Sequence, residues 1–582
     1  VHMRCEIIAL ASNKQLLNMG LDSAVDTHQS LDQTKLILFN STQEENDIIK
    51  VTFDVVGSLW KNKQIIFEMH PNHITYKVEV SGDGEAITDL NFLFGRKQTK
   101  NSTDFDAVYA PRFDWFEGAV LVDPESDDTL GCQQWLSPPP FAYAFVNDHE
   151  AVYCGIAAEV GTYNFLSFDY IGSRGASFRL TYEGHTAVSG TFSSPKLVIG
   201  FGNHEKNDAI ESYINYLRRH EYLPLEQPKE IPDWWHEPIF CGWGQMRYDY
   251  RFDHDGHENG NFINVTFYCT EQLYRNYIAS MEANDIDPGT IIIDMGWAQD
   301  PALHTPSPKR WSDMRGFIDE QHAKGRKVLL WYTPVVTQGL PDEACMTLSG
   351  RPICPDPTSP VYREILAEEI RWMISDEDGC LNADGFKIDF TQNTPSESGR
   401  FIGYINNFWG LINESNEKYL YPPLSDREEL IQTHGNKWGV EILREYISLL
   451  HTNMKLHKPD SMLITHTPNP YFTDIVDVLR LNDLDGECQD VLGVMQNRAR
   501  IAQMCAQNWL LDTDNDLMVD KARWRAYIQL QPQLGIPDTY YASAIANSQE
   551  EFNEGDYALL RKVWAEYRES LRPKEHLHSS AD

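Results

Sequence analysis

The first part of the chain shows short runs in which apolar and polar residues alternate. Such runs predict half-buried β-strands, and turn signals such as Ser81-Gly-Asp-Gly84 separate them. Many short strands at this spacing predict a β-sandwich over residues 1–225. The expected strands include Ile48–Val56, Gln64–Met69, His73–Val80, Ala151–Glu159, Ser177–Tyr182 and Lys196–Gly200.

The pattern changes near residue 225. Apolar residues at helical spacing predict a helix over Asp208–Tyr222, and Pro224, Pro228 and Pro232 then mark a linker. From Trp234 onward, short apolar runs alternate with helical stretches, which predicts a parallel sheet covered by helices. The remaining length suits one (β/α)8 barrel. We therefore expect a multidomain β + α/β protein, an N-terminal β-sandwich followed by a (β/α)8 TIM barrel with a C-terminal helix over residues 226–582.

The elements expected in the barrel follow from this alternation. The strands are Pro238–Gly242, Thr290–Met295, Lys327–Thr333, Gly385–Phe390, Ser461–Thr465, Val476–Leu481 and Thr539–Ala542. The helices are Glu271–Asn284, Met314–Lys324, Tyr362–Ser375, Val440–Leu456, Asp490–Leu510, Lys521–Leu530 and Tyr557–Leu571.

The segment Ala383–Phe390 is the most informative part of the sequence. Alternation along a strand places Lys387 and Asp389 on one face and apolar residues on the other. Burying that charged face is costly unless it lines a site. Because catalytic groups of β/α barrels lie at the carboxyl ends of the strands, Asp389 is a candidate nucleophile.

Other expected barrel strands also end in polar or aromatic residues. One such residue alone is weak evidence, because an Asp at a strand end often caps the next helix. Successive strands that all end this way predict a shared site. The candidate residues are Trp243, Asp294, Trp297, Trp331, His466, Arg480 and Asp483.

The strand-end series GWG, IIIDMGW, KVLLWYTP, DGFKIDF and VLRLND resembles glycoside hydrolase clan D. This clan comprises the α-galactosidase-like families 27 and 36 and the α-glucosidase-like family 31. The K-x-D strand end is its most specific element, and the D-x-G-W series on the second strand resembles family 36. The resemblance covers most of Trp234–Asp483. It implies a retaining α-glycosidase or, less often, a transglycosylase.

The resemblance also implies roles for individual residues. Asp389 matches the nucleophile and Asp483 the general acid/base. Asp294 and Lys387 match residues that bind sugar hydroxyls, and Arg480 suits the same task. The positions that form the walls of the sugar pocket in the clan correspond to Trp243, Trp297 and Trp331. His466 is either a structural residue or a substrate contact.

Two departures from the clan pattern leave alternatives open. In family 31 the acid/base follows an arginine by four positions, whereas Asp483 follows Arg480 by three. Asp485 or Glu487 is therefore an alternative acid/base. Galactose-specific members carry two adjacent acids on the second strand, whereas Met295 follows Asp294 here.

The composition of the chain limits the classes of molecule that it is expected to bind. The net charge is −37, from 49 Lys and Arg against 86 Asp and Glu. This charge disfavours nucleic acid and anionic membranes as partners and favours a neutral or cationic ligand. The ten cysteines show no zinc-ligand spacing and suit a reducing cytosol. We expect a cytoplasmic protein, leave open a removed signal peptide, and regard a homo-oligomer as compatible with the sequence.

No metal or organic cofactor is expected. The loop Tyr248–Asn261 is rich in Asp and His. Its histidines lack a metal-ligand spacing, so we expect a solvated insertion rather than a metal site. We expect a retaining α-glycosidase that acts on an oligosaccharide or glycoside of the α-galactoside or α-glucoside type. The alternatives are an α-transglycosylase of the same clan and a carbohydrate-binding relative without catalytic activity.

Overall fold

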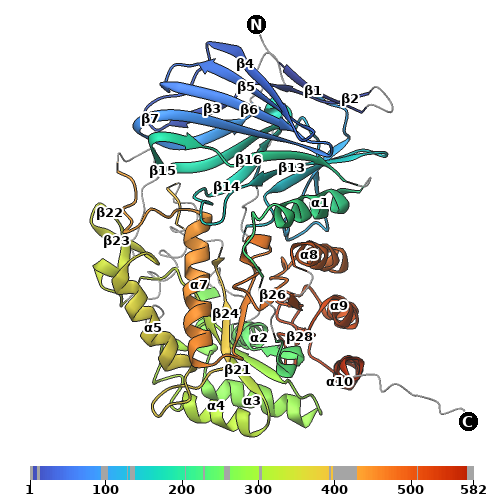
Figure 1. The fold of residues 1–582 in the computed structure, drawn as a ribbon. Helices are drawn as coiled ribbons and strands as arrows, with labels where there is room; N and C mark the ends of the chain where they lie inside the picture. The colour runs from blue at the N-terminus through green and yellow to red at the C-terminus, as the bar shows by residue number, and fades with distance from the viewer. Residues whose placement is uncertain are drawn as a thin grey trace, which may run out of the picture.

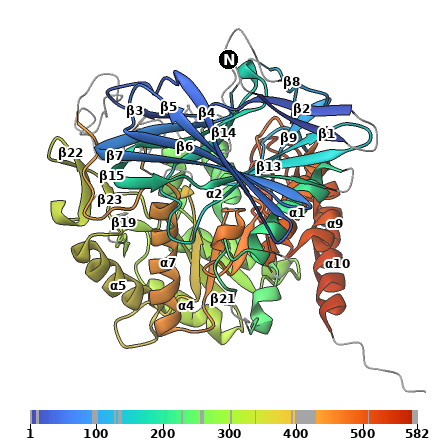
Figure 2. The same ribbon diagram turned by 45° about the horizontal axis from the view of Figure 1, so that its top comes forward.

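The computed structural model describes residues 4–9, 14–93, 102–126, 129–131, 138–202, 205–226, 230–254, 262–300, 304–337, 339–391, 395–397, 429–506 and 509–572. Antiparallel sheets from the first part of the chain lie against a parallel barrel from the second part (Figure 1 and Figure 2). Within these ranges, no helix is long and apolar enough to cross a membrane.

The N-terminal region is rich in antiparallel sheet, as the sequence predicted. A small sheet consists of β1 (Arg4–Ala9), β2 (Lys14–Gly20) and β8 (Ser102–Thr103). Among the described residues, this N-terminal region forms one further sheet, which has 13 strands. Its members are β3 (Ala24–Thr27), β4 (Leu36–Glu45), β5 (Ile48–Val56), β6 (Asn62–Met69), β7 (His73–Phe92), β9 (Ala107–Ala110), β10 (Val120–Val122), β11 (Thr129–Gly131), β12 (Ala142–Val146), β13 (Ala151–Ala157), β14 (Ser167–Ile171), β15 (Ser177–Ser193) and β16 (Lys196–Phe201).

The long strand β7 corrects one prediction. The sequence predicted a turn at Ser81–Gly84, but β7 runs through these residues without a break. The reason is tertiary, because Ser189–Thr191 of β15 pairs antiparallel with Ser81–Asp83 and keeps the backbone extended. Helix α1 (Lys206–Arg219) then lies against β12 and β13, and it confirms the helix predicted near residue 208.

The second part of the chain forms a parallel barrel of eight strands within the described residues. A parallel bridge between Asp512 and Ile536 joins the two ends of the sheet and nearly closes it. The order around the sheet is β27 (Leu510–Asp512), β26 (Val478–Arg480), β25 (Met462–Thr465), β24 (Gly385–Ile388), β21 (Lys327–Tyr332), β18 (Thr290–Ile293), β17 (Ile239–Cys241) and β28 (Asp538–Thr539).

Helices surround this barrel, as Figure 1 shows. They bury amphipathic faces on the strands, while strand residues such as Ile292, Leu329 and Phe386 are fully buried. The helices are α2 (Trp243–Asp253), α3 (Glu271–Ala283), α4 (Met314–Ala323), α5 (Pro360–Ile374), α7 (Val440–His457), α8 (Val491–Cys505), α9 (Lys521–Leu534) and α10 (Glu554–Leu571). Two hairpins accompany them, β19 (Ala298–Asp300) with β20 (Thr305–Pro306) and β22 (Cys345–Leu348) with β23 (Arg351–Pro355).

Strand β24 depends on a glycine at its first residue. Gly385 has φ +149°, and a Cβ there would lie 1.9 Å from the carbonyl oxygen of Met462 on β25. Only glycine allows this close approach of the two backbones. The approach fixes the register in which Lys387 faces Ile464.

Two predictions in the barrel are wrong. The helix predicted over Asp490–Leu510 ends at Cys505, and the strand β27 follows it. That strand has three residues and is too short for alternation to reveal it. The loop predicted over Tyr248–Asn261 begins instead within helix α2, whereas residues 255–261 lie outside the described residues.

Candidate active site

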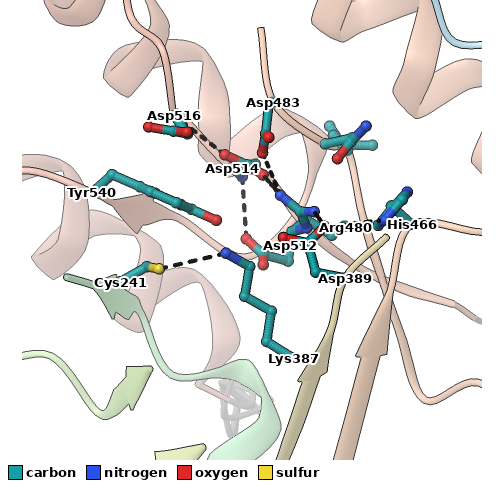
Figure 3. A network of polar contacts seen from close by, with 12 residues as sticks. Cys241, Lys387, Asp389, His466, Arg480, Asp483, Asp512, Asp514, Asp516 and Tyr540 are labelled. Carbon is teal, nitrogen blue, oxygen red and sulfur yellow. Dashed lines mark hydrogen bonds and ion pairs between the residues drawn. The ribbon is translucent and has the colours of Figure 1, made fainter. Parts of the chain in front are cut away.

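Asp389 follows β24 directly, and other predicted site residues surround its carboxylate (Figure 3). Its Oδ1 accepts a hydrogen bond from Arg480 Nη2 at 3.1 Å and lies 3.3 Å from His466 Nε2. Its Oδ2 accepts a hydrogen bond from the indole Nε1 of Trp331 at 3.1 Å. The Asp389 side chain is still 19% exposed, so a ligand can reach it. The carboxyl ends of neighbouring strands therefore bring together residues far apart in sequence.

The surroundings of Asp389 determine its charge. Burial opposes ionisation, but the Arg480 charge, the His466 hydrogen bond and the Lys387 charge outweigh burial and hold the pKa of Asp389 well below its usual range. Burial and the Arg480 charge lower the pKa of His466. The carboxylate is therefore ionised at neutral pH, which a nucleophile requires.

Lys387 and Asp294 form a buried pair deeper in the barrel. Lys387 Nζ lies 2.7 Å from Asp294 Oδ2, and each side chain is 3% exposed. The thiol of Cys241 donates to the same Oδ2 at 2.9 Å. Burial lowers the pKa of Lys387, but the Asp294 charge overrides it and raises that pKa well above the usual range. The pair places a fixed ammonium and a carboxylate side by side, which suits hydroxyl recognition.

Arg480 connects the two predicted catalytic carboxyls. Its Nη1 lies 2.5 Å from Asp483 Oδ1 and 2.6 Å from Asp514 Oδ2, while its Nη2 contacts Asp389. Figure 3 shows the three carboxylates around this guanidinium. Because the two nitrogens have a fixed spacing, the Oδ1 atoms of Asp389 and Asp483 lie at most about 8 Å apart. Retaining glycosidases hold their two carboxyl groups about 5–5.5 Å apart, and this spacing falls within the bound.

A left-handed residue explains the spacing of three between Arg480 and Asp483. Strand β26 ends at Arg480, and Asn482 has φ +69°. Asparagine tolerates this region better than most residues. The turn brings the Asp483 side chain back to the Arg480 guanidinium, although simple alternation would place the two on opposite faces.

The two alternative acids lie farther along the same loop. The Asp485 carboxylate accepts a hydrogen bond from the amide of Glu487 at 2.8 Å and so stabilises its own turn. Glu487 itself is exposed. Of the three candidates, Asp483 is the one for which the described contacts include Arg480.

Sequence reasoning missed a group of buried acids at the ends of β27 and β28. Burial and the Asp514 charge raise the pKa of Asp512 to about 6, and burial raises that of Asp516 to about 8. The pKa of Asp538 is raised well above its usual range by burial and the Asp512 charge. The sequence Leu-Leu-Asp-Thr-Asp-Asn-Asp at residues 510–516 could have revealed these acids. Two apolar residues followed by acids are typical of a barrel strand that ends at an active site. No group of three or more His, Cys, Asp or Glu in the described ranges is arranged to hold a metal.

The three predicted wall tryptophans differ in their surroundings. Trp331 contacts Asp389 directly. Trp297 is 1% exposed, and its indole donates to the carbonyl of Trp331 at 2.9 Å, so it lies behind that residue. Trp243 begins α2 and is partly buried.

Part of this chain is similar in sequence to one known protein family. Residues 260–418 match the glycosyl hydrolases family 31 TIM-barrel domain. This segment includes β18, β21 and β24 and thus Asp294, Trp331 and Asp389, and it ends before Asp483. No curated protein sequence matches the chain.

Three solved structures illustrate the shared fold. A family 31 sulfoquinovosidase from E. rectale is similar with a TM-score of 0.57 and 12% identity, over 97% of this chain and 82% of that one. An α-galactosidase from Thermus thermophilus has a TM-score of 0.50 and 13% identity, over 97% and 94%. A cycloalternan-forming enzyme from Listeria monocytogenes has a TM-score of 0.52 and 9% identity, over 92% and 55%.

At such low identity these structures show the fold alone. The family match agrees with the clan resemblance at the level of family 31. Residues 260–418, the part of the barrel that contains Asp294, Trp331 and Asp389, are thus similar to the family 31 barrel domain, and this match supports the chain being a glycoside hydrolase.

Proposed function

We propose that the chain is a retaining α-glycosidase that acts by double displacement, with Asp389 as nucleophile and Asp483 as general acid/base. One observation supports this most: an ionised carboxylate at a barrel strand end shares one buried guanidinium with a second carboxyl. The arrangement supplies the two carboxyl groups that retaining glycosidases need on either side of an anomeric carbon.

The first step forms a bond between Asp389 and the anomeric carbon C1. As it forms, the C1–O bond to the leaving group breaks, and its electron pair stays on the leaving oxygen, which takes the proton of Asp483. Oδ2 of Asp389 is suited to attack, because its one described hydrogen bond is with Trp331, whereas Oδ1 contacts Arg480, His466 and the Phe390 amide.

The second step releases the sugar. Asp483 takes a proton from water, the water oxygen bonds to C1, and the C1–Asp389 ester bond breaks with its electron pair returning to the carboxylate. The pair of carboxyls carries one negative charge in both resting forms, on Asp389 before attack and on Asp483 in the ester. Arg480 contacts both groups, so it can balance that charge in either form.

Substrate recognition is proposed to use the deeper pair. Lys387 and Asp294 offer donors and an acceptor to hydroxyl groups of the bound sugar, and Trp331 offers an apolar face beside the nucleophile. Sugar hydroxyl contacts can supply the energy of ring distortion. Both α-glucoside-type and α-galactoside-type substrates remain candidates.

Transfer to a second sugar is the alternative outcome of the same ester. An acceptor hydroxyl in place of water would make the chain an α-transglycosylase, and one structure of similar fold is that of a cycloalternan-forming enzyme. Product analysis at high acceptor concentration separates the two, because only a transferase makes new oligosaccharides in quantity.

The proposal is tested with p-nitrophenyl α- and β-glycosides of galactose, glucose, xylose, N-acetylgalactosamine and rhamnose. We expect cleavage of an α-glycoside with release of the α-anomer, read by proton NMR. Asp389→Asn should abolish turnover, whereas Asp319→Asn on the outer surface of α4 is the matched control and should keep it. Cleavage of β-glycosides alone, or full activity of Asp389→Asn, contradicts the proposal.

The choice of acid is tested with three conservative variants. We expect Asp483→Asn to lose about 10²–10⁴-fold on an unactivated glycoside. Asp485→Asn and Glu487→Gln should stay close to wild type. A large loss in either of these two, with Asp483→Asn unaffected, would move the role to the other acid.

A further inference from the structure

A second buried arginine lies beneath the loop that carries Asp483. Arg498 on α8 is 0% exposed. Its Nη1 donates to the carbonyl oxygens of Leu481, Asn482 and Asp483 at 2.7, 2.6 and 3.0 Å. Burial lowers the pKa of Arg498 to about 10, which still leaves it protonated at neutral pH. One guanidinium nitrogen thus binds three successive carbonyls of the turn.

These carbonyls belong to the part of the backbone that needs support. Asn482 holds a left-handed conformation, φ +69°, and this turn directs Asp483 to Arg480. Strained backbone of this kind persists only where the surroundings over-determine it. Further hydrogen bonds come from β27 and the residues after it, since the amides of Leu481 and Leu484 donate to the carbonyls of Asp512 and Asp516 at 2.9 and 3.4 Å.

The other side of the Arg498 guanidinium reaches the antiparallel sheet region. Its Nε and Nη2 both donate to the carbonyl oxygen of Asp114, at 3.2 and 2.7 Å, and it lies over the Phe113 ring at 5.5 Å. The connection between β9 and β10 contains both residues. The Asp114 carboxylate shapes this connection, because Oδ1 accepts from the amides of Phe116 and Glu117 at 3.0 and 3.1 Å.

The same connection also approaches the first turn of α8. A Cβ on Gly118 would lie 3.2 Å from the carbonyl oxygen of Gly493, so the two backbones pass each other closely. The Arg498 guanidinium therefore lies between the β9–β10 connection and the turn at residues 481–483 and donates hydrogen bonds to both.

From these contacts we propose that Arg498 is a positioning residue that holds the Asp483 carboxyl in place for proton transfer, with the β9–β10 connection as its second anchor. The proposal rests on the proposed function of Asp483. It assigns a part in the reaction to the sheet region, which contributes a carbonyl and an aromatic face to the support of the acid/base loop.

The test compares leaving groups that need protonation with one that does not. A methyl α-glycoside or a disaccharide requires a proton from Asp483, whereas an α-glycosyl fluoride loses fluoride without one. The substrates are the α-glucosyl and α-galactosyl forms of each. We expect Arg498→Met to lose about 10–100-fold in kcat/KM on the unactivated glycosides and no more than about 3-fold on the fluoride. Arg498→Lys, which keeps the charge, should be intermediate.

Two further variants complete the design. Arg500→Met removes the same side chain from an exposed position on α8 and is the matched control, expected to behave as wild type. Asp114→Ala keeps the carbonyl but removes the carboxylate that shapes the connection. It should give a smaller loss in the same direction, confined to the unactivated glycosides.

Amide hydrogen exchange provides a readout independent of turnover. We expect faster exchange in the peptide containing residues 481–484 of Arg498→Met, with exchange in β24 unchanged. Equal losses on the fluoride and the unactivated glycosides, or unchanged exchange at 481–484, would overturn the proposal. Failure of the proposed function looks different, because wild type would then cleave neither substrate, while the exchange result would still report whether Arg498 holds the turn.

Discussion

The buried pair of Lys387 and Asp294 offers a prediction that separates stability from function. Lys387→Met removes the ammonium but keeps a side chain of similar length. Asp294 then keeps the Cys241 thiol and the Met295 amide as hydrogen-bond donors and loses its only described cation. Asp294→Asn in the same chain removes the remaining charge.

The magnitude follows from the geometry. The two groups are 2.7 Å apart and each is 3% exposed, so neither can recover its solvation by moving into water. Removing one partner of a buried pair costs about 3–5 kcal/mol, whereas replacing both by neutral groups is often nearly neutral. We therefore expect Lys387→Met to lower the Tm by about 3–7 °C and the double variant with Asp294→Asn to regain most of that loss.

Activity should not follow stability in this series. Both side chains are proposed to bind sugar hydroxyls, so the double variant is expected to be stable and inactive. The assay is thermal unfolding by circular dichroism at pH 7, together with turnover of the best p-nitrophenyl α-glycoside. The reasoning fails if the double variant is as unstable as Lys387→Met, or if it regains activity along with stability.

Three further predictions concern pH and the buried carboxyls. Burial lowers the pKa of His73 to about 4, so the folded state resists protonation and stability should fall by up to about 3 kcal/mol as pH drops from about 6.5 to 4; His73→Gln should flatten that part of a Tm–pH profile. Burial opposes ionisation of Asp384, but the His322 hydrogen bond and the Lys458 and Lys327 charges outweigh it and lower the pKa of Asp384 to about 2. Its contribution of about 2 kcal/mol to stability is therefore present above about pH 4 and lost toward pH 2, so Asp384→Asn should be destabilised at pH 7 in urea titrations and approach wild type near pH 2. Burial raises the pKa of Asp516 to about 8, so the stability advantage of wild type over Asp516→Asn should shrink as pH rises from about 4 to 8, and an advantage that grows with pH would refute the assignment.

Much of the barrel could be predicted because local sequence patterns identify its strands. Ile291-Ile-Ile293 and Leu329-Leu330 are apolar runs that end in polar or aromatic residues, and each lies in a strand of the observed barrel. The parallel order then places their ends at one edge. This is why Asp294, Trp331 and Asp389 could be expected in one region before any distance was known.

Other features depend on tertiary contacts that leave no local pattern. Strand β27 has three residues, and its pairing with β26 is what defines it. The left-handed Asn482 carries no sequence signal that distinguishes it from an ordinary loop asparagine. Arg498 and Arg500 are likewise two residues apart on one helix, yet one is fully buried against backbone carbonyls and the other pairs with Glu211 at the surface.

The proposed mechanism depends on a covalent bond between the sugar and the Asp389 carboxylate. The direct measurement is mass spectrometry of peptides from protein treated with a 5-fluoro-α-glycosyl fluoride of the sugar it cleaves, a reagent that slows release of the ester. We predict one added sugar on the peptide that contains Asp389, and none on the same peptide of Asp389→Asn. A sugar attached to any other carboxyl, or turnover of substrate with inverted anomeric configuration, would contradict the central claim.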